Sequence, residues 1–324
     1  MLRIRLFGPV QASQSGVALP MPDRHDVIRL LAYLLLYRDR PLARKTVAFV
    51  LWPDGSESSA RAQLSRTLYR LQHEFLPPAA GRGDGPWLKA STSELQWSGD
   101  RPSWLDIQEF QERCDRGMGV GDGHALRSAV EDLERARRLY RGELLQDYAD
   151  EWIEAERKAF ASRYERLLER LAQLYVLDDQ ADRAVDVCRQ LLARDPLRES
   201  AYRIAMYAHM VKGERSAALR QFVECEAVLR RELDVLPEPA TAELARSIRA
   251  GDALETLTDL VFDPRLTVRG GPAGDPPRSA PADRERLGSF GRVPETPTRF
   301  VGRADTVQAI EQQAREGGVL AFLQ

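Results

Sequence analysis

Residues 41 to 76 predict a short helix, a tight connector and a long helix, and the apolar positions of the long helix give it one inner and one outer face. Four of them recur at i, i+4, i+7 and i+11, on one stripe of a helix: Leu64, Leu68, Leu71 and Phe75. The spacing predicts a long helix that is buried along this stripe. Asp54 with Glu57 three residues later has the form of a capping box, which predicts a helix start just after Pro53.

The opposite face of this helix is polar, and its side chains grow longer along it. Small residues stand at the N-terminal end, where a helix that reads DNA must approach base edges closely: Ser58, Ser59 and Ala62. Ser65 is a further small candidate, and longer polar side chains follow it, where they can reach bases or phosphates: Arg66, Tyr69, Arg70 and His73. For an isolated amphipathic helix, an ordinary solvated face is the commoner explanation. The surrounding sequence therefore decides between the two interpretations.

Short strands and further helices are predicted on both sides of the long helix. LRIRLFGPV and VALPMP alternate in polarity and are broken by Gly and Pro, which predicts short strands. DRHDVIRLLAYLLLYRDR has apolar residues in helical spacing and is stopped by Pro41. WLKASTSELQW predicts two brief strands about a Ser/Thr turn. The expected order is a small sheet, three helices and a β-hairpin.

Two stretches, RLLAYLLLYRDRPLARKTVAFVLWP and SARAQLSRTLYRLQ, resemble the OmpR-type winged helix in the form found in the antibiotic regulatory proteins of actinomycetes. The resemblance implies that the long helix enters the major groove and that the hairpin touches the neighbouring backbone or minor groove. It makes Lys89 a hairpin contact, and Lys45 and Thr46 phosphate contacts. Arg61 lies beside the apolar stripe, so we expect it either to cross to a phosphate or to pair within the fold.

The charge distribution agrees with a module that binds phosphates. Residues 1–76 hold eleven Lys and Arg against six Asp and Glu, a net of +5, whereas the whole chain carries −2. With 324 residues, 43% apolar and 30% charged, the chain is expected to form about two to three globular domains.

Composition also argues against several classes of protein. The N-terminus lacks the apolar core and cleavage site of a signal peptide, and the longest apolar run is interrupted by Arg29 and too short to span a bilayer. Three cysteines lie far apart, and four histidines have no metal-like spacing, so neither a disulfide framework nor a metal site is indicated. We therefore expect a cytoplasmic protein that has no membrane partner and holds no metal.

From Ala125 to about Arg249 nearly every segment has helical periodicity, and positions repeat at an offset of 34 residues. The repeating pairs are Leu171 and Ala205, Leu174 and Ala208, Ala184 and Ala218, and Cys188 and Phe222. This period is typical of tetratricopeptide repeats (TPR), in which small residues stand where paired helices cross. A generic helical bundle is the alternative, since its helices give similar patterns.

The resemblance extends into this helical region. LRSAVEDLERARRLYRGELLQDY, EWIEAER and ELDVLPEPATAEL look like the bacterial transcriptional activator domain that follows the winged helix in the same family. The family implies that this domain packs on the DNA reader, contributes to dimer contacts and helps communicate with RNA polymerase, through its sigma or alpha subunit.

The C-terminal part of the chain predicts a linker followed by a fragment of another domain. Residues 251–298 are expected to form a flexible linker, because from Asp263 onward they are rich in Pro, Gly, Arg and Asp. Residues 299–324 resemble the start of the nucleotide-binding domain of AfsR-like regulators, where Val301, Gly302 and Arg303 would border the adenine pocket. No G-x-x-x-x-G-K-[ST] loop occurs in these 324 residues, so we expect no cofactor here, and ATP or ADP only in a longer parent. A truncated regulator is expected, and a short natural protein with a vestigial tail is the alternative.

The sequence therefore predicts a mainly α protein with a small β component: a winged helix over residues 1–113 and a TPR-like domain over 114–250. Its expected function is sequence-specific activation of transcription. It would bind direct repeats of double-stranded promoter DNA as a homodimer and help recruit RNA polymerase holoenzyme at secondary-metabolite genes. The alternative is a protein-interaction scaffold whose winged helix does not bind DNA. An enzyme is not supported, since the sequence shows no Ser/His/Asp arrangement, no His/Cys cluster and no glycine-rich phosphate loop. The carboxylate pair Asp178 and Asp179 has the character of exposed turn residues.

Overall fold

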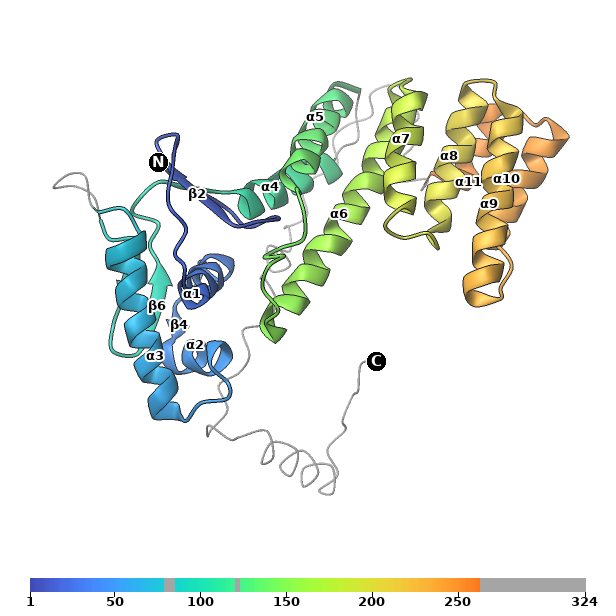
Figure 1. The fold of residues 1–324 in the computed structure, drawn as a ribbon. Coiled ribbons are helices and arrows are strands. Elements are labelled where there is room, and N and C mark those ends of the chain that lie inside the picture. Colours follow the sequence, from blue (N-terminus) through green and yellow to red (C-terminus); the bar gives the residue numbers. More distant parts are fainter. Residues whose placement is uncertain (79–84, 120–122, 263–324) are drawn as a thin grey trace, which may run out of the picture. The chain divides into compact units, whose positions relative to one another are not determined.

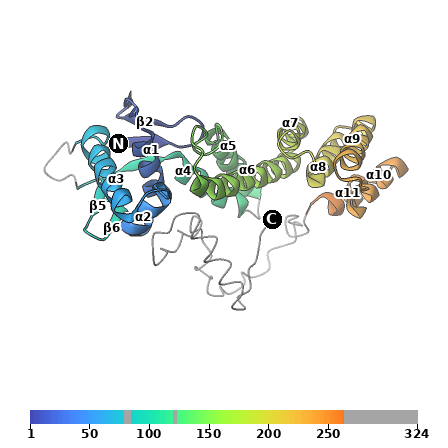
Figure 2. The same cartoon turned by 60° about the horizontal axis from the view of Figure 1, so that its bottom comes forward.

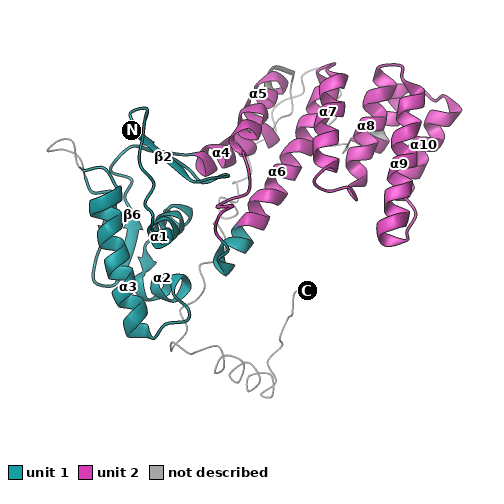
Figure 3. Ribbon diagram, viewed as in Figure 1, with its two compact units in different colours: residues 1–105, 149–156, 283–324 teal, residues 106–148, 157–282 magenta. Residues whose placement is uncertain are grey.

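The computed structural model describes residues 1–78, 85–119 and 123–262. Its fold is mainly helical with small sheets, as the sequence predicts. The described residues form two compact units, 1–105 with 149–156 and 106–148 with 157–262, which Figure 3 colours separately. The first unit ends eight residues before the expected boundary at 113 and includes a later segment as well. Expectations for residues 263–324, including Val301, Gly302 and Arg303, lie outside the described residues.

A four-stranded sheet opens the first unit. Its strands are β1 (Leu2–Arg5), β2 (Gln11–Gln14), β3 (Val17–Ala18) and β7 (Ser103–Leu105), in the order β3-β2-β1-β7. Strand β1 is antiparallel to β2 and parallel to β7, and its alternation buries Leu2 and Ile4 completely. The predicted N-terminal strands are confirmed. Strand β7 was missed, because three residues are too few to display a period of two.

The predicted hairpin is also confirmed and belongs to a second, three-stranded sheet. Strands β5 (Leu88–Ala90) and β6 (Glu94–Trp97) are antiparallel, and β4 (Leu42–Ala43) pairs with the other edge of β6. The turn is closed by Ser91, whose Oγ accepts hydrogen bonds from the backbone N–H of Ser93 at 3.2 Å and of Glu94 at 2.9 Å.

Three helices complete the winged-helix arrangement, and Figure 1 shows them beside the hairpin. They are α1 (His25–Leu36), α2 (Arg44–Leu51) and α3 (Glu57–Arg70), which continues as the π-helical turn η1 (Leu71–Phe75). The predicted inner stripe of the long helix is confirmed, because its four members are all buried: Leu64, Leu68, Leu71 and Phe75. Burial of this stripe against α1 and α2 fixes which face of α3 remains in water.

The predicted start of the long helix is wrong. The N-cap is Ser56, whose Oγ accepts a hydrogen bond from the backbone N–H of Ser59 at 3.3 Å. Asp54 lies earlier, in a turn in which the N–H of Gly55 donates to the carbonyl of Trp52. The residues between Trp52 and Ser56 are used to bend the chain after α2, so the capping role falls to the hydroxyl nearer the helix and not to the carboxylate.

The second unit is built from consecutive helices. These are α4 (Asp106–Met118), α5 (Gly123–Leu139), α6 (Glu151–Leu177, whose first turns belong to the first unit), α7 (Ala181–Leu192), α8 (Glu199–Val211), α9 (Arg215–Leu233), α10 (Pro239–Ala250) and α11 (Leu254–Val261). Helix α4 packs on α5, and α7 to α11 pack side by side (Figure 2). Among the described helices of both units, none combines the length and apolarity that crossing a membrane requires.

The 34-residue repeat is visible in the backbone of this unit. All four pairs of repeating side chains are buried. Three features of the turn between helices recur at the same offset. The backbone φ angle is positive at Asp179 and again at Gly213. The N–H of Gln180 donates to Tyr175 O, as that of Glu214 does to His209 O, and the N–H of Ala184 donates to Gln180 O, as that of Ala218 does to Glu214 O. The same chain geometry is thus built twice, which supports repeats over a generic bundle.

The expected linker begins too early. Residues 254–261 form α11, which packs against α8 and α10. Tyr207 on α8 exchanges a hydrogen bond of 2.9 Å with Thr258 Oγ1, and its ring meets that of Phe262 edge-on at 5.3 Å. Leu257 is completely buried. These apolar contacts outweigh the low helical signal of so short a segment, and the rest of the expected linker, 263–298, is outside the described residues.

The three cysteines are free and buried, and we expect them to be unreactive in the folded protein. Burial raises the pKa of the Cys114 and Cys225 thiols to about 12, and it also raises the pKa of Cys188. Because the thiolate is the reactive form, iodoacetamide near neutral pH should modify none of them before unfolding and all of them in denaturant. Mass spectrometry of the alkylated protein tests this, and rapid labelling of the native chain at any cysteine would contradict it.

Candidate nucleic-acid interface

The outer face of α3 and η1 presents almost every side chain that the sequence singled out. Arg70 is half-buried and the others are exposed: Ser58, Ser59, Arg61, Ala62, Ser65, Arg66, Tyr69 and His73. Tyr69 presents the largest ring on this face, with 61% of its surface exposed. The structure thus brings the predicted residues together on one helical surface.

Arg66 and Arg70 carry guanidinium groups that the protein itself does not use. Within residues 1–78, 85–119 and 123–262, neither group is held by an ion pair or a hydrogen bond. Tyr69 lies between them in sequence, and its ring contacts that of His73 at a centroid distance of 4.5 Å. The two cations can therefore bind a phosphate or a guanine without breaking an existing contact.

The remaining candidate cations are paired with carboxylates. Arg61 Nη2 lies 2.8 Å from Glu57 Oε1, and Lys45 Nζ lies 3.7 Å from the same oxygen. Arg61 therefore follows the second of the two alternatives that we expected and pairs within the fold. Lys89 Nζ lies 3.1 Å from Asp100, and hydrogen bonds from Ser98 and then Lys89 lower the pKa of that carboxyl. Exposed ion pairs of this kind are weak, so each cation can readily exchange its carboxylate for another anion.

Thr46 does not face phosphate, contrary to the expectation. Its residue surface is 4% exposed, because α2 turns it inward together with Val47, Ala48 and Leu51. Lys45, one position earlier, remains half-exposed. Adjacent helical residues point about 100° apart, so Lys45 reaches the surface although Thr46 is buried.

Arg44 was missed by the sequence analysis, although it directly precedes Lys45. Its Nη2 donates to Ser65 Oγ at 3.2 Å, and its Nη1 donates to the carbonyl of Ser91 at 3.4 Å. One guanidinium therefore links the middle of α3 to the turn of the hairpin. These groups border an open notch of about 960 Å³, whose lining comprises Ala43, Arg44, Lys45, Arg61, Leu64, Ser65, Ala90, Ser91, Thr92 and Ser93.

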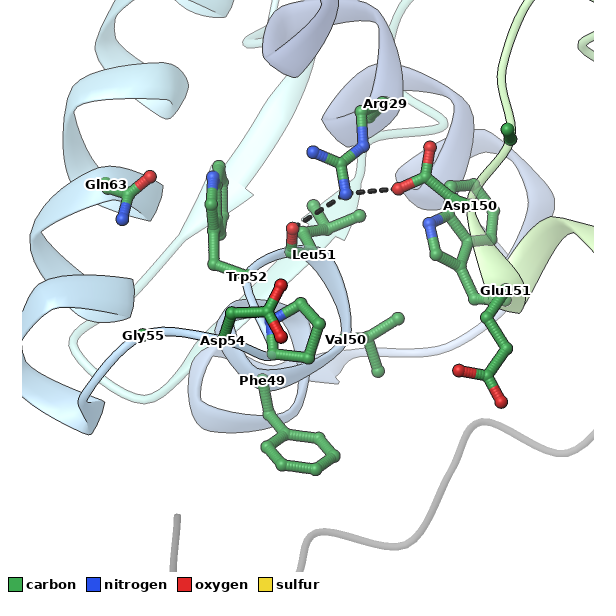
Figure 4. A pocket seen from close by; sticks show the side chains of 13 residues that line it. Arg29, Phe49, Val50, Leu51, Trp52, Asp54, Gly55, Gln63, Asp150 and Glu151 are labelled. Atoms are coloured by element: carbon green, nitrogen blue, oxygen red, sulfur yellow. Dashed lines mark hydrogen bonds and ion pairs between the residues drawn. The ribbon is translucent and has the colours of Figure 1, made fainter. Parts of the chain in front are cut away.

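The connector before α3 is held in place by Arg29 of α1. Its Nη2 donates to the carbonyl of Leu51 at 2.8 Å and pairs with Asp150, and Figure 4 shows both contacts beside a hollow that Trp52 and Asp54 help to line. Leu51 ends α2, so this bond satisfies a carbonyl that the helix leaves without a partner. Arg29 thereby fixes where the chain turns toward α3.

The base of the hairpin is fastened to the end of η1. Trp87 Nε1 donates to the carbonyl of Pro77 at 2.8 Å, and the buried Arg101 donates to the same oxygen at 3.1 Å and to the carbonyl of Pro78 at 3.2 Å. The Arg101 guanidinium also lies 3.9 Å from the centre of the Trp87 ring. Hairpin and long helix are thus joined by side chains as well as by the chain between them.

Residues 105–249 match the family model described as "Bacterial transcriptional activator domain". A winged helix with an exposed basic helix, joined to this domain, defines the chain as a DNA-binding transcriptional activator. The resemblance to the actinomycete antibiotic regulatory proteins, expected from the sequence, is confirmed.

Several proteins that this chain is similar to are themselves named as regulators. The transcriptional regulatory protein MoaR1 of Mycobacterium tuberculosis is 22% identical over 289 residues, which cover 88% of this chain and 91% of that protein. The regulatory protein AfsR of Streptomyces coelicolor is 25% identical over 333 residues, which cover 99% of this chain and 30% of AfsR. A solved structure of M. tuberculosis EmbR, in complex with a low-affinity phosphopeptide, shares the fold with a TM-score of 0.68 and 21% identity, over 80% of this chain and 68% of that one.

Proposed function

We propose that this chain activates transcription by binding promoter DNA through α3 in the major groove, with the hairpin β5–β6 on the adjoining backbone. The observation that carries the proposal is the outer face of α3, where Arg66, Tyr69 and Arg70 are presented to water while the opposite stripe is buried. Among the described residues neither arginine has a partner, so both guanidinium groups can bind a phosphate or a base edge.

The proposed mechanism is non-catalytic, and the two parts of α3 have different roles in it. At its N-terminal end Ser58, Ser59 and Ala62 are small enough to let the backbone approach base edges. Farther along, Arg66 and Arg70 reach guanine or phosphate, and binding releases the counterions condensed on the DNA. Lys45, Arg61 and Lys89 would contact the flanking phosphates after leaving their carboxylate partners.

A single winged helix reads too few base pairs for specificity in a genome, so we propose that two copies bind as a homodimer on direct repeats. The activator domain at residues 105–249 would then help recruit RNA polymerase holoenzyme through its sigma or alpha subunit. Secondary-metabolite promoters are the proposed targets, because the family resemblance is to antibiotic regulators. Such a protein would act in the cytoplasm.

Gel-shift titrations at several salt concentrations test the proposal against a scaffold function. With fragments from the promoters of neighbouring genes, we expect a retarded band at low salt and a log–log salt slope of about −0.9 for each phosphate neutralised. At least one fragment should bind more tightly than random DNA of the same length. If no band is retarded even at low salt, the winged helix does not bind DNA, and the repeats would be the functional surface.

A further inference from the structure

Two cations at the edge of the proposed interface share one carboxylate. Lys45 extends from α2 and Arg61 from the second turn of α3, and both contact the same oxygen of Glu57. The side chains of Lys45 and Glu57 are 31% and 35% exposed, and that of Arg61 is 59% exposed. Solvent therefore reaches all three groups, and neither cation is locked into the protein interior.

The same two cations border the notch between α2, α3 and the hairpin turn. Arg44 adds a third positive charge to this lining, which also includes Ser65, Ser91, Thr92 and Ser93. Three cations with several hydroxyl donors are the groups that bind a phosphate oxygen in protein–DNA complexes. Glu57 is not part of the lining, yet its carboxylate neutralises one charge at the rim.

We propose that this notch seats one phosphate of the DNA backbone and that Glu57 is a built-in competitor for its cations. The proposal rests on the proposed DNA-binding function and adds a residue that limits affinity. In the free protein Glu57 holds Lys45 and Arg61, and a bound phosphate must either replace it or tolerate its negative charge nearby.

The consequence is a lower affinity for DNA of any sequence. Phosphate contacts supply nearly all of non-specific binding, so a carboxylate beside a phosphate seat acts most strongly on that kind of binding. Base contacts from Arg66 and Arg70 lie farther along α3 and do not depend on Glu57. A regulator facing a genome-wide excess of random sites gains selectivity when its sequence-independent affinity is kept low.

A structural role for Glu57 is the explanation to be separated from this one. An acidic residue in the first turn interacts favourably with the helix dipole, and Glu57 occupies that turn. The helix has its own N-cap in Ser56, however, so the carboxylate is not needed to close the helix end. A structural role predicts loss of stability on substitution and no gain in DNA affinity.

The test compares Glu57→Gln with Asp54→Asn in fluorescence-anisotropy titrations of a random-sequence duplex. Both variants remove one negative charge from the same stretch of chain, but Asp54 is exposed and contacts neither cation of the pair. For Glu57→Gln we expect affinity to rise roughly threefold to tenfold, against less than about twofold for Asp54→Asn. The salt slope should steepen by about 0.9 for each cation released.

A double substitution shows whether the gain passes through the named cations. In a Lys45→Met/Arg61→Met background, Glu57→Gln should change affinity by less than about twofold, because neither cation remains to be released. Equal gains for Glu57→Gln and Asp54→Asn, or a gain that persists in this background, would overturn the proposal while leaving DNA binding intact. A wild-type chain that binds no duplex at low salt would refute the proposed function itself, and the phosphate seat with it.

Discussion

Replacing Arg66 or Arg70 by Ala should weaken binding to a specific operator by about 1–3 kcal/mol per residue, roughly fivefold to 150-fold. This effect is expected if either guanidinium makes a bidentate contact with a base, and discrimination at that base pair should then flatten. Neither side chain has a partner among the described residues, so removing it leaves no orphaned group behind in the protein. The effect should therefore appear in binding and not in stability.

Parallel titrations on operator and random duplexes measure this effect. Arg189→Ala is the matched control, because Arg189 is also an exposed helical arginine but lies on α7 of the second unit. Equal weakening on both duplexes would make Arg66 and Arg70 phosphate contacts, since phosphates carry no sequence information. If neither variant bound operator more weakly than Arg189→Ala, the assignment of this face to DNA would be wrong.

Much of the fold follows from periodicity, because burial selects one face of each element. The stripe through Leu64 and Leu71 and the repeat that relates Ala184 to Ala218 both predicted buried surfaces correctly. The hairpin could also be predicted from the sequence, since Ser91 stands where a short polar side chain can close a turn. In each case the information is local or repeats along the chain, and the sequence alone carries it.

Other features depend on which residues meet in space, and these were not predictable. The pairing of Lys45 with Glu57 joins two helices across a bend, and Arg44 reaches Ser91 over 47 positions of chain. Thr46 was expected at a phosphate because the family resemblance implied it, whereas in this chain α2 buries its side chain. Conversely, α11 had too few residues for its pattern to stand out before its neighbours were known.

Arg101→Ala is expected to lower the free energy of unfolding of the first unit by about 2–4 kcal/mol. The guanidinium donates to two backbone carbonyls and lies over the Trp87 ring, so truncation removes charge-assisted hydrogen bonds and a cation–π interaction together. Pro78 O would no longer receive the hydrogen bond that Arg101 supplies. Chemical denaturation followed by tryptophan fluorescence measures the change, because Trp87 itself packs against Arg101.

The same substitution should also weaken DNA binding, although Arg101 is only 7% exposed and cannot serve as a major DNA-binding side chain. Only the Trp87 bond to Pro77 O would still fasten the base of the hairpin to the residues after η1, so Lys89 and the turn would be less well placed for the DNA backbone. We therefore expect a shallower salt slope for Arg101→Ala, by about 0.9 for each phosphate that the hairpin no longer neutralises. Arg101→Lys should retain part of both properties, because it keeps the charge but not the planar fork that spans two carbonyls. Full stability with unchanged DNA affinity in Arg101→Ala would mean that the chain connection alone positions the hairpin.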